Sequence, residues 1–240
     1  MRLDINCDMG EGLSNDAALM PYINSANIAC GYHAGDEDTM KRTAELAQQH
    51  HVAIGAHPGF ADKANFGRTE MILPLNEIHD LVCSQVYLLQ KIAESMGAVL
   101  THVKPHGALY NMSAKDPLLA NTIAKAVGAV SPQLILFGLS GSHSITEAKR
   151  SGLNTRSEVF ADRTYQDNGS LTPRSQPGAL IDDTKKCMEQ IIQMAAEGTV
   201  WSINGKKVSI NAETLCIHGD GDHALDFAKV IFESLQKLPH

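Results

Sequence analysis

The feature that most constrains the fold is a regular alternation of short apolar segments with amphipathic segments along almost all of the 240 residues. Seven segments have the length and polarity pattern of strands, and a segment of helical period follows each of them. The predicted strands are residues 2–7, 25–30, 51–56, 98–103, 134–139, 155–161 and 214–217. The predicted helices are residues 16–22, 38–50, 74–96, 117–130, 141–150, 183–196 and 223–238, with Asp36 and Asp116 as N-caps.

Repeated strand–helix units force parallel pairing with right-handed crossovers, which leaves an open doubly wound sheet or a closed barrel. In the open sheet functional side chains gather at one switch point, whereas in the barrel every strand directs its carboxyl end at one site. All the predicted strands except 134–139 end in acidic, basic or histidine side chains, which favours the barrel. We therefore predict an α/β fold, a seven-stranded parallel β/α barrel related to the TIM barrel, as a single domain over residues 1–240. Asn204-Gly205 predicts a small β-hairpin excursion near residues 200–210.

One strand end, residues 101–111 (THVKPHGALYN), carries a dense group of polar side chains. His102, Lys104, His106 and Asn111 follow one another there, and a proline and a glycine between them predict that a loop begins. Loops at the ends of rigid strands are the usual place for chemistry. By strand alternation His102 shares a face with Lys104 but lies deeper, so a packed core histidine is the alternative for it.

If the barrel closes, the acids, imidazoles and cations at the strand ends converge on one bowl. Such a set suits general acid–base catalysis at a polarised carbonyl, with cations stabilising developing negative charge. The predicted catalytic residues are Asp8, Glu11, His57, Lys104, His106, His218 and Asp220. The predicted substrate-binding residues are Asn27, His33, Arg68, Asn111, Asp162 and Arg163. A structural ion pair is the alternative for Asp162 and Arg163, and a helix cap is the alternative for Asp220.

A metal site is a further possibility at the same strand ends. Asp8, His57 and either His106 or His218 would form a carboxylate–histidine site with an open position, as hydrolytic Zn²⁺ sites have. The chain has no HxH or HExxH spacing, so the sequence leaves open whether a divalent metal is bound. It also has no dinucleotide fingerprint and no Walker loop, because the glycines at 138 and 141 are too close and no lysine follows them.

Charge and composition exclude several classes of function. The formal net charge of −7 argues against non-specific nucleic-acid binding. No apolar run approaches the length of a transmembrane helix, and the acidic start MRLDINCDMGEG does not resemble a signal peptide. The five cysteines are scattered without CxxC spacing, which indicates reduced thiols and predicts a cytoplasmic protein.

Six blocks of sequence together resemble the LamB/YcsF (PxpA) family, whose members serve as the A component of 5-oxoprolinase. The blocks are LDINCDMGEG, SANIACGYHAGD, IGAHPGF followed by FGR, HVKPHGALYN, EVFADRTY followed by LTPRSQPGA, and CIHGDGDHA. They stand in the family's order from about residue 2 to about residue 235, so the set is far more specific than any single block. The resemblance implies a seven-stranded β/α barrel of the glycoside hydrolase/deacetylase-like class.

The resemblance also implies a hydrolase acting on a cyclic amide, which opens 5-oxo-L-proline (pyroglutamate) to L-glutamate at the expense of ATP. Partner subunits B and C (PxpB and PxpC) are expected to handle ATP and to phosphorylate the lactam carbonyl. The lack of a nucleotide motif in this chain agrees with that division of labour. This chain would then complete the hydrolysis of the activated ring.

The roles expected of single residues depend only on their shared position at strand ends. Asp8 or His57 would activate water, Glu11 or Asp220 would orient it, Lys104 and Arg163 would hold the phosphate or carboxylate, and His106 or His218 would protonate the ring nitrogen. Two other functions remain as alternatives: a stand-alone metal-dependent deacetylase or amidohydrolase, and a non-catalytic subunit that binds substrate or serves as a scaffold. The first predicts activity without ATP, and the second predicts that strand-end substitutions change assembly but not turnover.

Overall fold

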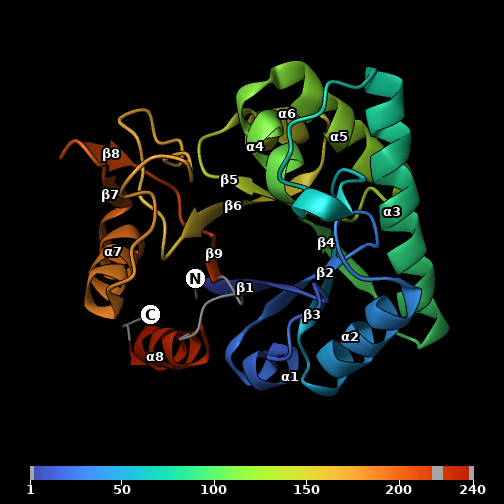
Figure 1. Ribbon diagram of the computed structural model, residues 1–240, viewed down its shortest axis with the longest axis horizontal. Coiled ribbons are helices and arrows are strands. Elements are labelled where there is room, and N and C mark those ends of the chain that lie inside the picture. Colours follow the sequence, from blue (N-terminus) through green and yellow to red (C-terminus); the bar gives the residue numbers. More distant parts are fainter. Residues whose placement is uncertain (1–2, 218–223, 238–240) are drawn as a thin grey trace.

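A closed barrel of parallel strands forms the centre of the computed structural model, which describes residues 3–217 and 224–237 (Figure 1). The order around the barrel is β1-β2-β3-β4-β5-β6-β9, and β9 closes it by pairing in parallel with both β1 and β6. The strands are β1 (Asp4–Met9), β2 (Ser25–Ala29), β3 (Ala53–His57), β4 (Leu100–Val103), β5 (Ile135–Leu139), β6 (Asn154–Phe160) and β9 (Thr214–Ile217). The predicted seven-stranded parallel barrel is therefore confirmed.

Helices surround this barrel (Figure 1). They are α1 (Asp16–Leu19), α2 (Glu37–Gln49), α3 (Leu75–Ser95), α4 (Gly107–Lys115), α5 (Pro117–Val130), α6 (His143–Arg150), α7 (Thr184–Glu197) and α8 (Ala224–Lys237), with the 3₁₀ turns η1 (Met20–Tyr22) and η2 (Lys63–Asn65). Asp36 caps α2, because its carboxylate accepts hydrogen bonds from the backbone N–H of Thr39 at 2.8 Å and from its hydroxyl at 2.6 Å. Asp116 caps α5 in the same way, as predicted.

Helix α4 was not expected from the sequence, which predicted a loop between residue 104 and the helix at 117. The segment is helical because it buries Ala108, Leu109, Tyr110 and Ser113, while Gly107 takes up a positive φ of 54° at its start. Two strands extend further at their carboxyl ends than predicted. β1 continues to Met9 and β3 to residue 57, so that Asp8 and His57 belong to strands and are held more rigidly than loop residues.

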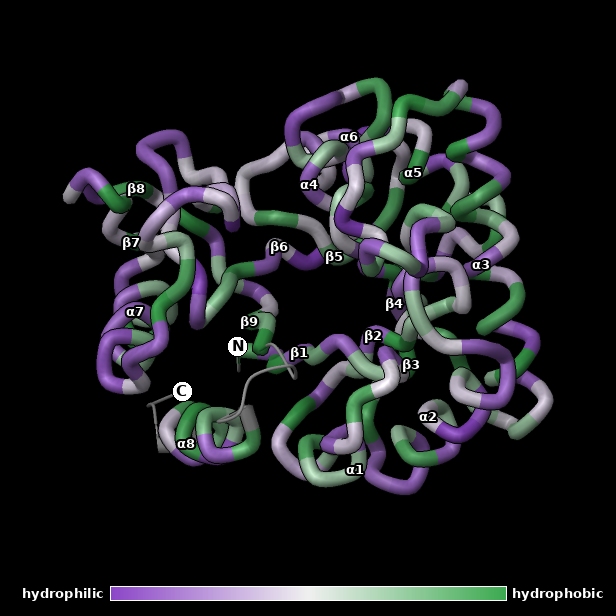
Figure 2. Tube along the Cα trace, viewed as in Figure 1, coloured by the Kyte–Doolittle hydropathy of each residue, from purple (hydrophilic) through white to green (hydrophobic). Residues whose placement is uncertain are grey.

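The interior of the barrel is polar, whereas apolar side chains fill the layer between strands and helices. Hydrophilic residues accordingly interrupt the hydrophobic central strands (Figure 2). Inside the barrel the amide of Asn6 donates to Thr214 Oγ1 at 2.8 Å, and the amide of Asn27 donates to Asn6 Oδ1 at 2.8 Å. Barrels of this type more often fill their interior with branched aliphatic side chains. Here the hydrogen-bonded polar side chains of Asn6, Asn27 and Thr214 form an interior polar network, which extends from the barrel centre to the carboxyl ends of the strands.

A two-stranded antiparallel sheet lies outside the barrel, at the place of the predicted hairpin. It pairs β7 (Thr199–Trp201) with β8 (Lys207–Ser209), and Gly205 in the turn has a φ of 77°. Within the described ranges, no helix combines the length and the apolar character needed to cross a membrane.

Candidate active site

The carboxyl ends of the barrel strands border a cavity of about 1020 Å³. Small-molecule sites usually have volumes of about 300–1,000 Å³, so this cavity is large for a metabolite. Five predicted catalytic residues line it, namely Asp8, Glu11, His57, Lys104 and His106. The predicted substrate-binding residues Arg68, Asn111 and Arg163 also line it.

Lys104, directly after β4, is the centre of a buried ion-pair network. Its Nζ lies 2.9 Å from Asp8 Oδ1 and 2.9 Å from Glu158 Oε1. The side chain of Lys104 is 4% exposed, that of Glu158 0% and that of Asp8 14%, so only Asp8 presents appreciable surface to the cavity. Burial by itself lowers the pKa of the Lys104 ammonium, but the adjacent Asp8 and Glu158 carboxylates outweigh it and raise that pKa well above its ordinary value.

Two neutral side chains inside the barrel also hold the Lys104 ammonium in place. Its ammonium donates to Asn6 Oδ1 at 3.2 Å and lies 3.1 Å from Cys216 Sγ. The amide of Asn27 donates to Asp8 Oδ1 at 2.9 Å, so that oxygen receives two donors. Asn27 therefore orients a predicted catalytic carboxylate and belongs to the barrel interior, where it is fully buried.

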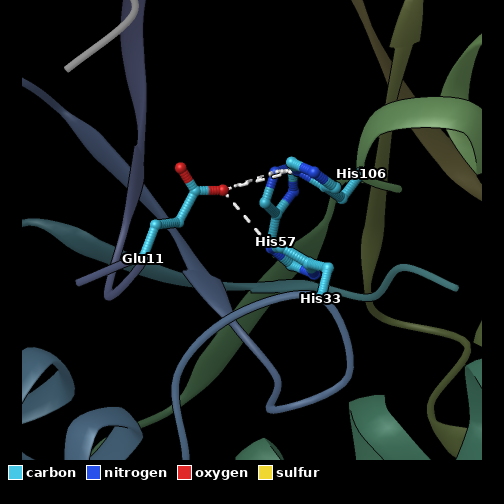
Figure 3. Close-up of side chains that lie close together, drawn as sticks. All are labelled: Glu11, His33, His57 and His106. Atoms are coloured by element: carbon cyan, nitrogen blue, oxygen red, sulfur yellow. Dashed lines mark hydrogen bonds and ion pairs between the residues drawn. The ribbon is translucent and has the colours of Figure 1, made fainter. Parts of the chain in front are cut away.

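Three imidazoles and one carboxylate form a second cluster beside the Lys104 network (Figure 3). The Oε1 atom of Glu11 lies 3.3 Å from His33 Nε2, 3.4 Å from His106 Nδ1 and 3.9 Å from His57 Nε2. The rings of His33 and His106 stack with centroids 3.7 Å apart. His57 Nε2 also lies 3.3 Å from Asp8 Oδ2, which joins the two clusters into one site.

The imidazoles of this cluster are buried in the protein. Burial, reinforced by the neighbouring His57, lowers the pKa of His33 to about 3 and that of His106 to about 2. Both rings are therefore neutral at physiological pH, and each carries one N–H and one nitrogen lone pair.

The remaining predicted residues have different positions. Asp162 is the second residue after β6 and is not among the residues that line the cavity; its backbone carbonyl accepts from Ile181 N at 2.8 Å. Arg163 lines the cavity and also donates to the carbonyl oxygens of Thr172 at 2.6 Å and Ala179 at 3.4 Å, which ties the loop at 164–178 to the barrel. His218 and Asp220 lie outside the described residues.

His102 is a packed histidine of the barrel interior. Its ring stacks on Phe137 with centroids 4.3 Å apart, and its Nε2 lies 2.9 Å from Asn27 Oδ1. Burial, reinforced by the positive charges of Arg156 and Lys104, lowers its pKa to about 3, so His102 is a neutral member of the interior polar network. The alternative of a core histidine is the one that the geometry bears out.

Sequence reasoning missed several residues of the site. Two of these residues, Glu158 and Cys216, contact the Lys104 ammonium. A third is Tyr110: burial together with the nearby Glu158 raises the pKa of its hydroxyl well above the ordinary value, so the hydroxyl stays protonated. The signal for Glu158 was a single acid two residues before Phe160 in a strand that buries its last four residues. The cavity wall also contains charged and histidine side chains that no motif identified, namely Glu70, Lys115, His143, Glu147 and Arg150, together with Arg174 from the block LTPRSQPGA.

Comparisons with known proteins place this barrel among close relatives. Residues 3–239 match the model of the LamB/YcsF family. The chain is 53% identical over 228 residues to a protein of Erwinia tasmaniensis whose name makes it the A component of 5-oxoprolinase, covering 95% of this chain and 93% of the relative. It is 51% identical over 238 residues to a Brevibacillus brevis protein of the same name, covering 97% and 94%. Among solved structures, the lactam utilization protein from Thermus thermophilus has a TM-score of 0.93 at 39% identity and covers 99% of this chain and 97% of its own.

Proposed function

Because the chain belongs to the LamB/YcsF family, we propose that it serves as the subunit of a 5-oxoprolinase that hydrolyses an activated lactam ring, converting 5-oxo-L-proline to L-glutamate. The observation that carries this proposal is the joined pair of clusters at the barrel mouth, where an oriented carboxylate faces a cavity beside neutral imidazoles. The names of the relatives at 51–53% identity support the substrate.

The reaction needs help that this chain does not supply by itself. An amide carbonyl is a poor electrophile, and phosphorylation of its oxygen makes the carbon open to attack by water. We assign ATP binding and this phosphorylation to the partner subunits B and C. The word subunit in the relatives' name supports a complex of several chains, and the size of the cavity leaves room for the phosphorylated ring.

In the hydrolytic step we assign the base to Asp8. Its side chain is 14% exposed, whereas that of His57 is 1% exposed, so the carboxylate has the better access to a water molecule in the cavity. Water donates a proton to Asp8 and its oxygen bonds to the carbonyl carbon; the ring C–N bond then breaks, its electron pair stays on nitrogen, and the proton held by Asp8 passes to that nitrogen. The product of this step is an acyl phosphate, and a second water molecule hydrolyses it to the carboxylate and inorganic phosphate.

The network around Lys104 changes the role expected for that residue. Two carboxylates already surround its ammonium at 2.9 Å, so the trio carries a net negative charge and is a poor holder for a phosphate. We assign to Lys104 the orientation of Asp8 and the maintenance of its charge. We assign the binding of the substrate's anionic groups to the cavity wall, where Arg68, Arg163 and Arg174 lie.

The test is to mix the chain with its two partner subunits, ATP and 5-oxoproline, and to measure glutamate while each component is omitted in turn. Glutamate is expected only from the complete mixture. Full activity without this chain would refute its catalytic role and support a scaffold at most. Activity of this chain without ATP would support instead a stand-alone amidohydrolase, the second candidate, which the histidine–carboxylate cluster at the cavity favours.

The cytoplasm is the compartment we propose for this reaction. Cys7, Cys30, Cys83, Cys187 and Cys216 are free thiols, and three of them, Cys7, Cys30 and Cys216, lie in or directly after barrel strands. Reduced thiols are typical of cytoplasmic proteins. Fractionation of cells that express the chain, followed by detection with an antibody, would test the assignment.

A further inference from the structure

The ligand atoms of Glu11, His57 and His106 have the mutual distances of a metal coordination sphere. Glu11 Oε1 lies 3.4 Å from His106 Nδ1 and 3.9 Å from His57 Nε2, and the two nitrogens lie 2.9 Å apart. A tetrahedral zinc ion bound at about 2.0–2.1 Å separates its ligand atoms by roughly 3.3–3.4 Å. The observed distances lie around that value.

The tautomers of two rings follow from their outer hydrogen bonds. His57 Nδ1 lies 2.6 Å from the carbonyl oxygen of Lys104, and His106 Nε2 lies 2.8 Å from the carbonyl oxygen of Phe66. A carbonyl oxygen only accepts, so both of these ring nitrogens carry the N–H. Histidine ligands of metals commonly donate their other N–H to a backbone carbonyl in this way.

The inner nitrogens of the two rings consequently face each other as lone pairs. In neutral rings with these tautomers, His57 Nε2 and His106 Nδ1 are both acceptors, yet they are only 2.9 Å apart. The nearby carboxylate of Glu11 adds further negative charge at the same point. Three electron-rich atoms at this spacing require a cation, either a proton or a metal ion. The three inner atoms all border the cavity, where a metal ion can reach them, while the outer N–H groups of both rings are already bound to backbone carbonyls.

We propose that Glu11, His57 and His106 bind one divalent transition-metal ion of the zinc class, and that His33 positions Glu11. The three ligands all line the cavity, so the remaining coordination position is directed at the substrate space. Two histidines and a carboxylate with an open position form a donor set used by catalytic zinc sites. The metal site considered from the sequence, Asp8, His57 and His106 or His218, shares two histidines with this proposal, which has Glu11 in place of Asp8.

His33 is assigned a positioning role because of its other nitrogen. Its Nδ1 is buried and has no hydrogen-bond partner within the described part of the chain. If Nε2 bound the metal, Nδ1 would carry a buried N–H without an acceptor, which is costly. If Nε2 instead donates to Glu11 Oε1 at 3.3 Å, only a lone pair is left unsatisfied.

The backbone closes tightly over the stacked rings. A Cβ atom on Gly59 would lie 2.8 Å from His33 Nδ1, and one on Gly67 would lie 2.8 Å from His33 Cβ and 2.9 Å from His106 Cδ2. Only glycine therefore allows the two loops to approach these imidazoles. The cluster is thus held in place before any ion binds, as a specific site requires.

Metal binding can be measured without substrate, ATP or partners, so the inference goes beyond the proposed function and is tested independently of it. The purified full chain is stripped with a chelator and titrated with Co²⁺ and then Zn²⁺. We expect one equivalent of Co²⁺ to bind with visible absorption bands of low coordination number, and Zn²⁺ to displace it. Zn²⁺ at a hundredfold excess over its dissociation constant should raise the Tm by about 5–10 °C.

Matched variants identify the ligands. His106→Gln and Glu11→Gln should abolish the absorption bands and the rise in Tm, whereas His33→Gln should weaken binding by about 10–100-fold and keep the bands. His50→Gln, at an exposed position after α2, is the control and should bind as the wild type does. Absence of a Zn²⁺-dependent Tm rise in the wild-type chain would overturn the proposal whether or not the variants fold. Loss of all binding in His33→Gln would overturn the positioning role and make His33 a ligand.

Discussion

Replacement of Lys104 by methionine is expected to destabilise the barrel strongly. Methionine keeps most of the side-chain volume but removes the ammonium that lies 2.9 Å from both Asp8 and Glu158. Glu158, with 0% exposure, then becomes a buried charge without a cation, while Asp8, with 14% exposure, can be hydrated from the cavity. The loss should therefore correspond to one broken buried pair, about 3–5 kcal/mol, and not to two.

The assay is urea denaturation at pH 7 followed by circular dichroism. A domain of this kind has a total stability of about 5–15 kcal/mol, so the variant should remain folded with a clearly lower midpoint. Adding Glu158→Gln to the variant removes the uncompensated charge and should restore part of the stability, which a double-mutant cycle measures. Lys115→Met, at the exposed end of α4, is the control and should change the free energy of unfolding by less than about 0.5 kcal/mol. A loss below about 1 kcal/mol for Lys104→Met would refute the network as described.

Two further predictions concern the scaffold. Gly55→Ala places a Cβ atom against the ring of His102, which Asn27 and Phe137 hold in position, so the free energy of unfolding measured in urea should fall by about 1–3 kcal/mol. The control is Gly128→Ala in α5, where the new Cβ atom meets only ordinary contacts, and it should be neutral or stabilising. Asp36→Ala should lower the Tm at pH 7, because hydrogen bonds from the Thr39 hydroxyl and backbone hold the pKa of Asp36 below its ordinary value of 3.8. A carboxyl group whose pKa is lower in the folded chain than in the unfolded chain stabilises the fold at pH values above the unfolded-state pKa. The difference in Tm between the wild type and Asp36→Ala should therefore be complete above pH 3.8 and vanish as the pH falls through the lowered pKa. A difference in Tm that persists at lower pH would contradict the role of Asp36 as a cap.

The barrel could be predicted because its elements are repeated and each signal is local. Short apolar strands and amphipathic helices bury their apolar faces in the same way in each unit, and polar residues at most strand ends favour closure over an open sheet. Helix α4 escaped prediction because the proline and glycine before it suggested a loop, and only four buried residues on a short segment favour the helix.

Some members of the candidate site could be predicted from the sequence, but their pairings could not. Asp8, His57 and Lys104 stand at strand ends and could be recognised there. Glu158 lies two residues before the end of β6, and its pairing with Lys104 depends on the way the strands meet inside the closed barrel. The contact between Glu11 and His33 likewise joins loops after β1 and β2, whose course no periodic pattern describes.

The central claim is that this chain performs the hydrolysis at the carboxyl ends of its strands, and Asp8→Asn tests it most directly. The substitution keeps the size of the side chain and removes the proposed base. In the complete mixture with partner subunits, ATP and 5-oxoproline, the rate of glutamate formation should fall by about 10²–10⁴-fold, while circular dichroism shows the wild-type fold. A folded Asp8→Asn chain that forms glutamate at the wild-type rate would contradict the assignment.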